Sequence, residues 1–312
     1  RNKLRGRWGK SVLVSLIAAL LGGIPGSGGS TAGSASGAGS ASGGLAGSGA
    51  GMSPDAMLDG TLENALDQFA ACLPRNRDLY YGGAWHPAKS GRSFETSSPG
   101  DGRSLGHVAE ASAEDVEAAL QAATDGFAEW RATPPLARAR ILREIAARIR
   151  ANADELALLD ALDCGNPRTA MAMDSHSSAE QLDFFAGLVT EMKGASVPMG
   201  PNILNVSVRE PLGIVAKIIA FNHPFMFCAA KSAAPLAAGN AVIVRPPEQA
   251  PLSALRFSEL IDGLLPAGVF SVMPGGREAG AALASHPLVA KVSVIGSVQT
   301  GRAVLAAGAP TI

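Results

Sequence analysis

The sequence predicts an α/β fold in which helices cover both faces of a parallel sheet. Four short runs rich in β-branched residues lie between residues 211 and 307, and each precedes an Ala/Leu-rich segment with helical spacing. Gly, Pro, Asn or Ser marks each boundary. Apolar strands that alternate with helices are typical of parallel sheets buried on both faces. The predicted strands are Gly213–Phe221, Asn240–Arg245, Val269–Met273 and Lys291–Ile295.

The carboxyl ends of these strands are the expected place for a ligand. Open parallel sheets bind ligands in the crevice beside the carboxyl ends of their strands. Here those ends carry the segments FNHP, RPPE, MPGG and GSVQTG. Four such units in succession suit a dinucleotide, so we look for functional residues in these segments.

Composition excludes several function classes. The 312 residues allow about two domains, and 47% hydrophobic residues support a large core. A net charge of -1 provides no electrostatic footprint for nucleic acid or for an anionic membrane. The five histidines show no metal-ligand spacing, so no metal site is predicted. Three widely separated cysteines form neither a disulfide framework nor a metal cluster, which favours a reduced, cytoplasmic setting. They are Cys72, Cys164 and Cys228.

The first fifty-one residues differ in composition from the rest. Arg1–Lys10 is basic, Val12–Leu21 is apolar, and Gly22–Gly51 is almost entirely Gly, Ser and Ala. A basic start before a short apolar run resembles a signal peptide. The alternative, which we favour, is that this leader is not native coding sequence, because ordinary globular composition begins at Met52. In either case a Gly/Ser-rich tract predicts disorder over residues 1–51.

Residues 52–196 are predicted to form a helical and β-hairpin portion before the α/β portion of residues 197–312. Ser112 and Asp115 have the spacing of a capping box at a helix start. Pro and Gly interrupt the helical pattern at two places. The predicted elements are a weak amphipathic helix in Met52–Leu73, extended segments in Leu79–Val108, and helices in Ser112–Trp130, Leu136–Asp163 and Ser175–Met192, with breaks at Pro134-Pro135 and Gly165-Asn166-Pro167.

Four sequence blocks, in this order, resemble the aldehyde dehydrogenase superfamily. The likeness extends from about Leu79 to Ile312, and its density over about 100 residues makes it specific. It implies a Rossmann-like sheet with flanking helices that binds NAD, with NADP as the other coenzyme. The blocks are REPLGIVAKIIAFNHPF (Arg209–Phe225), KSAAPLAAGNAVIVRPPEQAP (Lys231–Pro251), LPAGVFSVMPGG (Leu265–Gly276) and SHPLVAKVSVIGSVQTGR (Ser285–Arg302).

The resemblance implies the oxidation of a small-molecule aldehyde to a carboxylic acid. In the family, a cysteine forms a thiohemiacetal, a hydride passes to the nicotinamide, and a thioester is hydrolysed. The family's general-base Glu and nucleophilic Cys would both follow Ile312. We therefore expect this chain to be the coenzyme-binding half of an enzyme that is a homo-oligomer at full length, and to be inactive alone. The alternative is a non-catalytic nucleotide-binding module.

Two candidate catalytic residues follow from the resemblance. Asn222 matches an Asn whose amide stabilises the developing oxyanion, a task that suits a neutral donor. Without the resemblance, an Asn in a strand-to-helix turn would cap the following helix. Lys231 matches a Lys associated with a proton path or a backbone brace, although a Lys on a helix is commonly solvated. We interpret His223 as a turn residue beside the substrate tunnel, and Cys228 as a small buried hydrophobe.

Arg245 and Glu248 are candidate cofactor-binding residues at the end of the second strand. The family has a Lys and a Glu here, which bind the adenosine ribose. A carboxylate accepts hydrogen bonds from the 2′- and 3′-hydroxyls and repels a 2′-phosphate, which favours NAD. A guanidinium can pair with a 2′-phosphate, so Arg245 also allows NADP. The alternative is an exposed ion pair that needs no ligand.

The remaining cofactor-binding candidates lie at the ends of the other strands. Gly allows the backbone to approach a ligand closely, and free N–H groups at a helix start favour an anion such as pyrophosphate. Most Gly-Ser turns before helices bind nothing, so these assignments depend on the resemblance. The candidates are Ile219, Phe221, Gly275, Gly276, Gly296 and Ser297.

Overall fold

The computed structural model describes residues 71–311. The leader predicted over residues 1–51 lies outside the described residues, as does most of the helix predicted in Met52–Leu73. Within residues 71–311, no helix combines the length and the apolar character that crossing a membrane requires.

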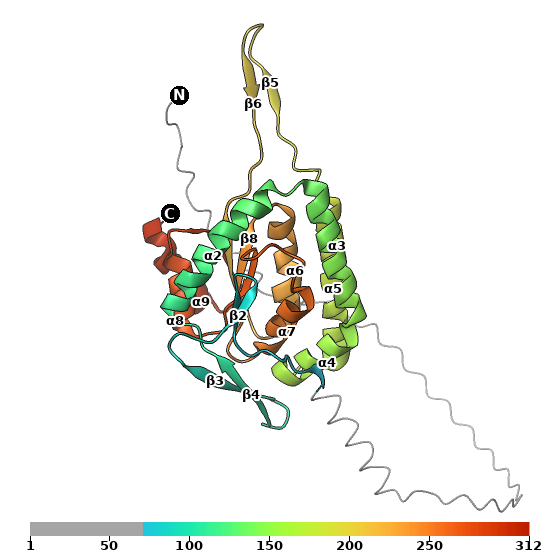
Figure 1. The fold of residues 1–312 in the computed structure, drawn as a ribbon, viewed down its shortest axis with the longest axis vertical. Coiled ribbons are helices and arrows are strands. Elements are labelled where there is room, and N and C mark those ends of the chain that lie inside the picture. Colours follow the sequence, from blue (N-terminus) through green and yellow to red (C-terminus); the bar gives the residue numbers. More distant parts are fainter. Residues whose placement is uncertain (1–70, 312) are drawn as a thin grey trace, which may run out of the picture. The chain divides into compact units, whose positions relative to one another are not determined.

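A six-stranded sheet forms the centre, in the order β10-β7-β8-β9-β1-β2 (Figure 1). Its four parallel strands confirm the predicted ones. Two short antiparallel strands extend it beyond β9, where Tyr80 pairs with Val272. The bounds are β7 Ile214–Ile218, β8 Ala241–Arg245, β9 Phe270–Val272, β10 Val289–Val294, β1 Leu79–Tyr81 and β2 Ala84–His86.

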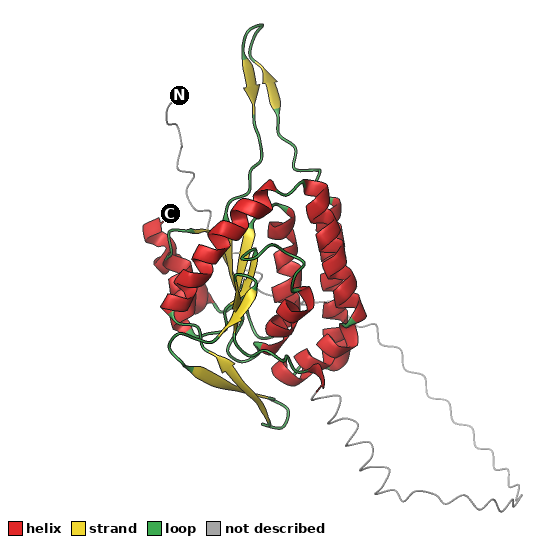
Figure 2. Cartoon of the chain, viewed as in Figure 1, coloured by secondary structure: helices red, strands yellow, loops and turns green. Residues whose placement is uncertain are grey.

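Helices cover both faces of this sheet, as the sequence predicts (Figure 2). Apolar side chains of α2, α8 and α9 pack with Ile214, Ala216 and Ile218 on one face. On the other face lie α6 and α7, and the helices α3, α4 and α5 pack beyond them. The bounds are α2 Ala113–Ala132, α3 Pro135–Ala151, α4 Ala153–Cys164, α5 Arg168–Gly187, α6 Pro224–Ala237, α7 Leu252–Ile261, α8 Arg277–Ser285 and α9 Val298–Gly308, followed by a short 3-10 turn at Ala309–Thr311.

The predicted capping box starts α2. Ser112 Oγ accepts the Asp115 N–H at 3.3 Å, and Asp115 Oδ2 accepts the Ser112 N–H at 2.9 Å. Such a cap stabilises a helix by about 1 kcal/mol. The predicted break after α4 is also confirmed, because Gly165 has a left-handed φ of 81°.

Two helix predictions were wrong in extent. The single helix predicted over Leu136–Asp163 is two helices, separated at Asn152, whose side chain donates to the Arg148 carbonyl at 2.7 Å. An Asn that bonds to nearby backbone competes with the helix. The helix predicted over Ser175–Met192 begins at Arg168, directly after Pro167, and ends at Gly187. The buried face of this helix includes the polar residues Asp174, Ser175 and Ser178. The spacing of its hydrophobic residues alone therefore does not show the helical period.

Among residues 71–311, two hairpins lie outside the central sheet. β3 (Ser93–Ser97) pairs with β4 (Ser104–Ala109), and β5 (Ser196–Pro198) pairs with β6 (Leu204–Val206). The β5–β6 hairpin extends away from the helices, and its strands are exposed (Figure 1). The domain boundary at residue 196 stays a prediction, and the sheet takes strands from both sides of it.

Candidate functional site

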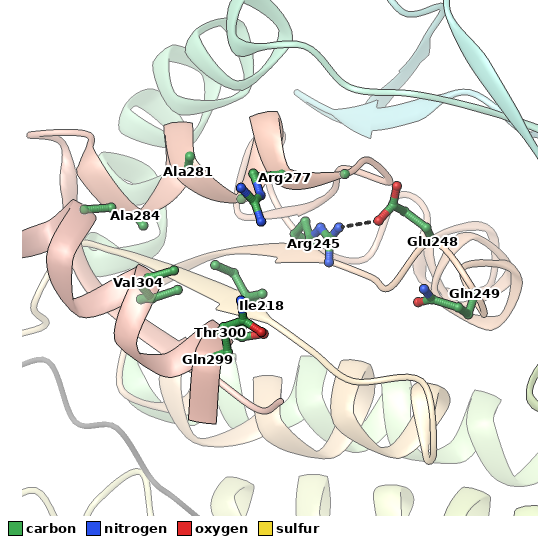
Figure 3. Close-up of a pocket in the computed structure, with 14 residues that line it drawn as sticks. Ile218, Arg245, Glu248, Gln249, Arg277, Ala281, Ala284, Gln299, Thr300 and Val304 are labelled. Carbon is green, nitrogen blue, oxygen red and sulfur yellow. Dashed lines mark hydrogen bonds and ion pairs between the residues drawn. The ribbon is translucent and has the colours of Figure 1, made fainter. Parts of the chain in front are cut away.

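A cavity of about 390 Å³ lies at the carboxyl ends of β7 and β8, between α8 and α9 (Figure 3). Ala281 and Ala284 from α8 and Val304 from α9 contribute to an apolar wall, together with Ile218 at the end of β7. The charged lining residues are Arg245, Glu248 and Arg277. An apolar wall beside charged groups can hold an aromatic ring attached to a polar group.

Arg245 and Glu248 meet at the mouth of this cavity. Arg245 Nη2 lies 3.3 Å from Glu248 Oε2, and the Arg245 side chain is 13% exposed whereas that of Glu248 is 46% exposed. Burial lowers the pKa of Arg245, and Glu248 partly offsets that effect. The Arg245 Nε is buried and has no hydrogen-bond partner among residues 71–311. This donor is therefore available to a bound group.

The two glycines after β9 differ in what their small size allows. A Cβ atom at Gly276 would lie 2.9 Å from Glu248 Oε1, so Gly276 makes room for the carboxylate at the cavity. A Cβ atom at Gly275 would meet the backbone of Ala111 at 3.1 Å, where the Ala111 N–H donates to the Pro274 carbonyl. Packing by itself already requires a small residue at position 275, and of these two glycines only Gly276 lines the cavity.

The turn that carries Asn222 is attached to α4 and α5. The Asn166 side chain donates to the Asn222 carbonyl, and His223 Nδ1 lies 2.6 Å from Asp174 Oδ2. His223 is the N-cap residue of α6, so Asn222 does not cap that helix. The Asn222 side chain is exposed and makes no hydrogen bond to the part of the chain that the structure describes. The structure thus holds the backbone of this turn and leaves the amide available.

Lys231 lies half-buried on α6, on the opposite face of the sheet from the cavity. The buried Lys217 of β7 lies near it: burial, Lys291 and Lys231 lower the pKa of Lys217 to about 8. Cys228, one turn before Lys231, is fully buried, and burial raises the pKa of its thiol. A thiol held protonated in this way agrees with its interpretation as a buried hydrophobe.

The other predicted residues lie at the same edge of the sheet but do not line the cavity. Ile219 is buried, and its N–H donates to the Arg245 carbonyl at 3.2 Å. Phe221 is 54% exposed. Ser297 Oγ accepts the Thr300 N–H at 3.1 Å and caps α9, with Gly296 exposed before it. The structure therefore brings Arg245, Glu248 and Gly276 together in the cavity lining, whereas the other predicted cofactor-binding residues lie outside the lining and Lys231 lies on the other face of the sheet.

Several residues of the cavity lining were not predicted from the sequence. Arg277 directly follows Gly275-Gly276, at the start of α8, and could have been found as the next residue after a strand end. Gln299 and Thr300 lie three and four residues after Gly296, and line the cavity from α9. The apolar lining carried no local signal, because alanines on a helix are found on any packed face.

Known proteins match this part of the chain. The family model described as "Aldehyde dehydrogenase family" matches residues 85–312. Aldehyde dehydrogenase tropH from Talaromyces stipitatus is 45% identical over 237 residues, which are 75% of this chain and 46% of that protein.

Solved structures agree with this match. PnpE from Pseudomonas sp. WBC-3, solved in complex with nicotinamide adenine dinucleotide, is 36% identical with a TM-score of 0.74, over 76% of this chain and 49% of PnpE. The NAD⁺ complex of an aldehyde dehydrogenase from Bacillus cereus is 34% identical with a TM-score of 0.75, over 78% of this chain and 50% of that enzyme. The chain spans about half the length of these relatives. With matches that cover the sheet, the helices and the cavity, the chain belongs to the aldehyde dehydrogenase family.

Proposed function

We propose that this chain is the coenzyme-binding half of an enzyme that oxidises an aldehyde to a carboxylate with NAD or NADP. The observation that carries the proposal is the cavity at the ends of β7 and β8, lined by Arg245, Glu248 and Gly276. Its residues fit the adenosine half of a dinucleotide: one wall of the cavity is apolar, a Cβ at Gly276 would crowd Glu248, and Arg245 Nε is a buried donor without a partner among residues 71–311. When bound, the coenzyme accepts the hydride from the substrate.

Within this proposal, Glu248 accepts hydrogen bonds from the ribose hydroxyls, which supports NAD. Arg245 keeps NADP as the alternative, because its guanidinium can pair with a phosphate. Gly296 and Ser297, at the start of α9, are proposed to lie along the pyrophosphate with Gly275, since unpaired N–H groups at a helix start attract anions. Ile219 and Phe221 are proposed to border the coenzyme at the end of β7.

Of the two proposed catalytic residues, Asn222 lies just before α6 and Lys231 lies about two turns into it. Asn222 would donate its amide hydrogen bond to the oxygen that becomes negatively charged when the aldehyde is attacked, and its exposed, unengaged side chain supports this role. Lys231 would take part in a proton path or brace the backbone near it. The cytoplasmic location and the homo-oligomeric state expected from the sequence stay predictions.

Titration of the 312-residue protein with NAD and NADP tests this proposal. We expect saturable binding, by calorimetry or nucleotide fluorescence, that Glu248→Ala weakens. Glu129→Ala, which removes an exposed carboxylate of α2 outside the cavity, is the matched control and should bind as the unchanged protein does. A protein that is folded by circular dichroism and binds neither dinucleotide would refute the coenzyme site.

A further inference from the structure

Lys217 is a buried lysine on β7, the strand between β10 and β8. The residue is 6% exposed, and it pairs with Val244 of β8 and with Ser293 of β10. Its side chain lies on the α6 face, because its neighbours Ala216 and Ile218 belong to the core on the other face. A lysine is almost never buried to this extent unless its charge is paired.

Two more lysines lie around the Lys217 ammonium. Lys291 of β10 pairs with Val215, so Lys291 and Lys217 are diagonal neighbours on one face of adjacent strands. Lys231 approaches from α6, which covers this face. Burial, Lys291 and Lys231, in this order, lower the pKa of Lys217 to about 8. The structure therefore places three positive charges together.

No negative group among residues 71–311 offsets these charges. None of the three ammonium groups makes an ion pair or a hydrogen bond with another residue of that range. The other titratable group that acts on Lys217 is Cys228, and burial raises the pKa of its thiol, which keeps it neutral. The hydroxyl of Ser293, half-buried beside Lys217, is likewise not engaged within residues 71–311. Because buried charges are normally paired, this cluster lacks a counter-charge.

We propose that Lys217, Lys231 and Lys291 form a binding site for a phosphate group on the α6 face of the sheet. The site lies on the opposite face from the coenzyme cavity and does not depend on the proposed function. A phosphate group can carry two negative charges, and its oxygens accept charge-assisted hydrogen bonds from ammonium groups. The Ser293 hydroxyl adds a neutral donor.

The site is open to a ligand from solvent. Lys291 and Ser293 are half-buried, and they lie on the outermost strand of the described sheet. The Nζ of Lys217 is not among the fully enclosed, unpartnered polar atoms of residues 71–311, although most of the side chain is buried. A lysine in this position buries its stem and presents its ammonium at the surface.

Urea denaturation in inorganic phosphate, against chloride of equal ionic strength, tests the site on the 312-residue protein. A ligand that binds only the folded state raises the urea midpoint, and the phosphate concentration dependence gives an apparent dissociation constant. Each variant is compared with itself in chloride, so a change in its own stability cancels. The general effect of phosphate as a salt is common to all variants.

Two variants remove charges from the site and two serve as controls. We expect Lys217→Met and Lys291→Gln each to raise the apparent dissociation constant of phosphate about tenfold. Lys193→Met removes an exposed lysine, and Arg277→Ala removes a positive charge from the coenzyme cavity. Each control should change the constant less than about twofold. Lys231 stays unchanged, because the proposed function also involves it.

A phosphate monoester, glycerol 2-phosphate, distinguishes two sources of the group. Stabilisation by inorganic phosphate alone assigns the site to the free ion, and stabilisation by both assigns it to the phosphate of a larger molecule. The site is wrong if phosphate acts equally on the unchanged protein and on Lys217→Met. It is also wrong if Arg277→Ala alone removes the effect, since phosphate then binds in the coenzyme cavity. Should Lys217→Met not fold, the half-buried Lys291→Gln decides by the same criterion.

Discussion

His223 Nδ1 lies 2.6 Å from Asp174 Oδ2, which joins the turn after β7 to the middle of α5. Because an ionised carboxylate only accepts hydrogen bonds, the ring nitrogen donates. The Asp174 residue is only 8% exposed, so it depends on this partner. The neighbouring Asn222 carbonyl is held by Asn166, and the Phe225 N–H by Asp160. The turn with the candidate oxyanion donor is thus anchored at three successive points by α4, α5 and the loop between them.

We predict that His223→Phe lowers the free energy of unfolding by about 1–3 kcal/mol, because it leaves a buried carboxylate without its donor. Urea denaturation followed by circular dichroism measures this change. His223→Asn, which keeps a nitrogen donor at nearly the same position, should recover most of it. In the background of Asp174→Ala, the same His223→Phe change should cost little. An equal cost in both backgrounds would show that the pair contributes nothing.

Asn222 should affect the chemical step and leave coenzyme binding unchanged, since it lies outside the cavity lining. In an enzyme preparation that contains this chain and oxidises aldehydes, we predict that Asn222→Ala lowers kcat about 100-fold or more. Loss of one oxyanion donor has an effect of this size in other enzymes. The dissociation constant of the coenzyme should stay the same. Asn202→Ala, at an exposed position near the β5–β6 turn, is the matched control. An unchanged kcat would remove Asn222 from the proposed mechanism.

Local signals were sufficient for the parallel strands and for the start of α2. The Ser112–Asp115 spacing is a short-range property, and so is the apolar run of each strand. The break at Asn152 could not be predicted from hydrophobic period, because Leu142, Ile145, Ile149 and Leu156 are all buried and keep that period across it. The extension of the sheet depends on pairing between Tyr80 and Val272, which no local pattern encodes.

The candidate site, too, could be predicted only as far as local sequence signals allow. Arg245, Glu248 and Gly276 each follow a strand, so the general rule about strand ends found the segments, and the resemblance selected the residues. The alanines of α8 became lining only through the placement of α9 opposite them. Arg277 could not be predicted as a lining residue, because its place there depends on how α8 packs beside α9, which no local pattern encodes.

Asp160 should make stability depend on pH. Burial raises the pKa of Asp160 to about 7 in the folded protein, whereas an unfolded Asp titrates near 3.9. The folded state therefore binds the proton more tightly. The contribution of Asp160 to the stability of the folded protein is therefore complete below about pH 4 and is lost as the pH rises through 7. We predict that the urea concentration at the unfolding midpoint decreases as the pH is raised from 5 to 8. The decrease should be smaller in Asp160→Asn, whose side-chain carbonyl still accepts the Phe225 N–H. An identical pH dependence in both proteins would assign the effect to other groups.

Lys217 is expected to cost stability at neutral pH. It is 6% exposed, and burial together with Lys291 and Lys231 lowers its pKa to about 8 in the folded protein, against 10.5 in the unfolded chain. Between these values the unfolded state binds more protons, so this group makes stability rise with pH from about 8 to about 10.5. At pH 7 the folded protein must bury the ionised amine.

We therefore predict that Lys217→Met, of similar length and without charge, raises the free energy of unfolding at pH 7 by about 1–3 kcal/mol and flattens its rise above pH 8. Lys193→Met removes an exposed lysine whose ion pair with Glu191 is solvated, and it should change stability by less than about 1 kcal/mol. If Lys217→Met is destabilising at pH 7, the ammonium must gain more from its surroundings than burial costs it.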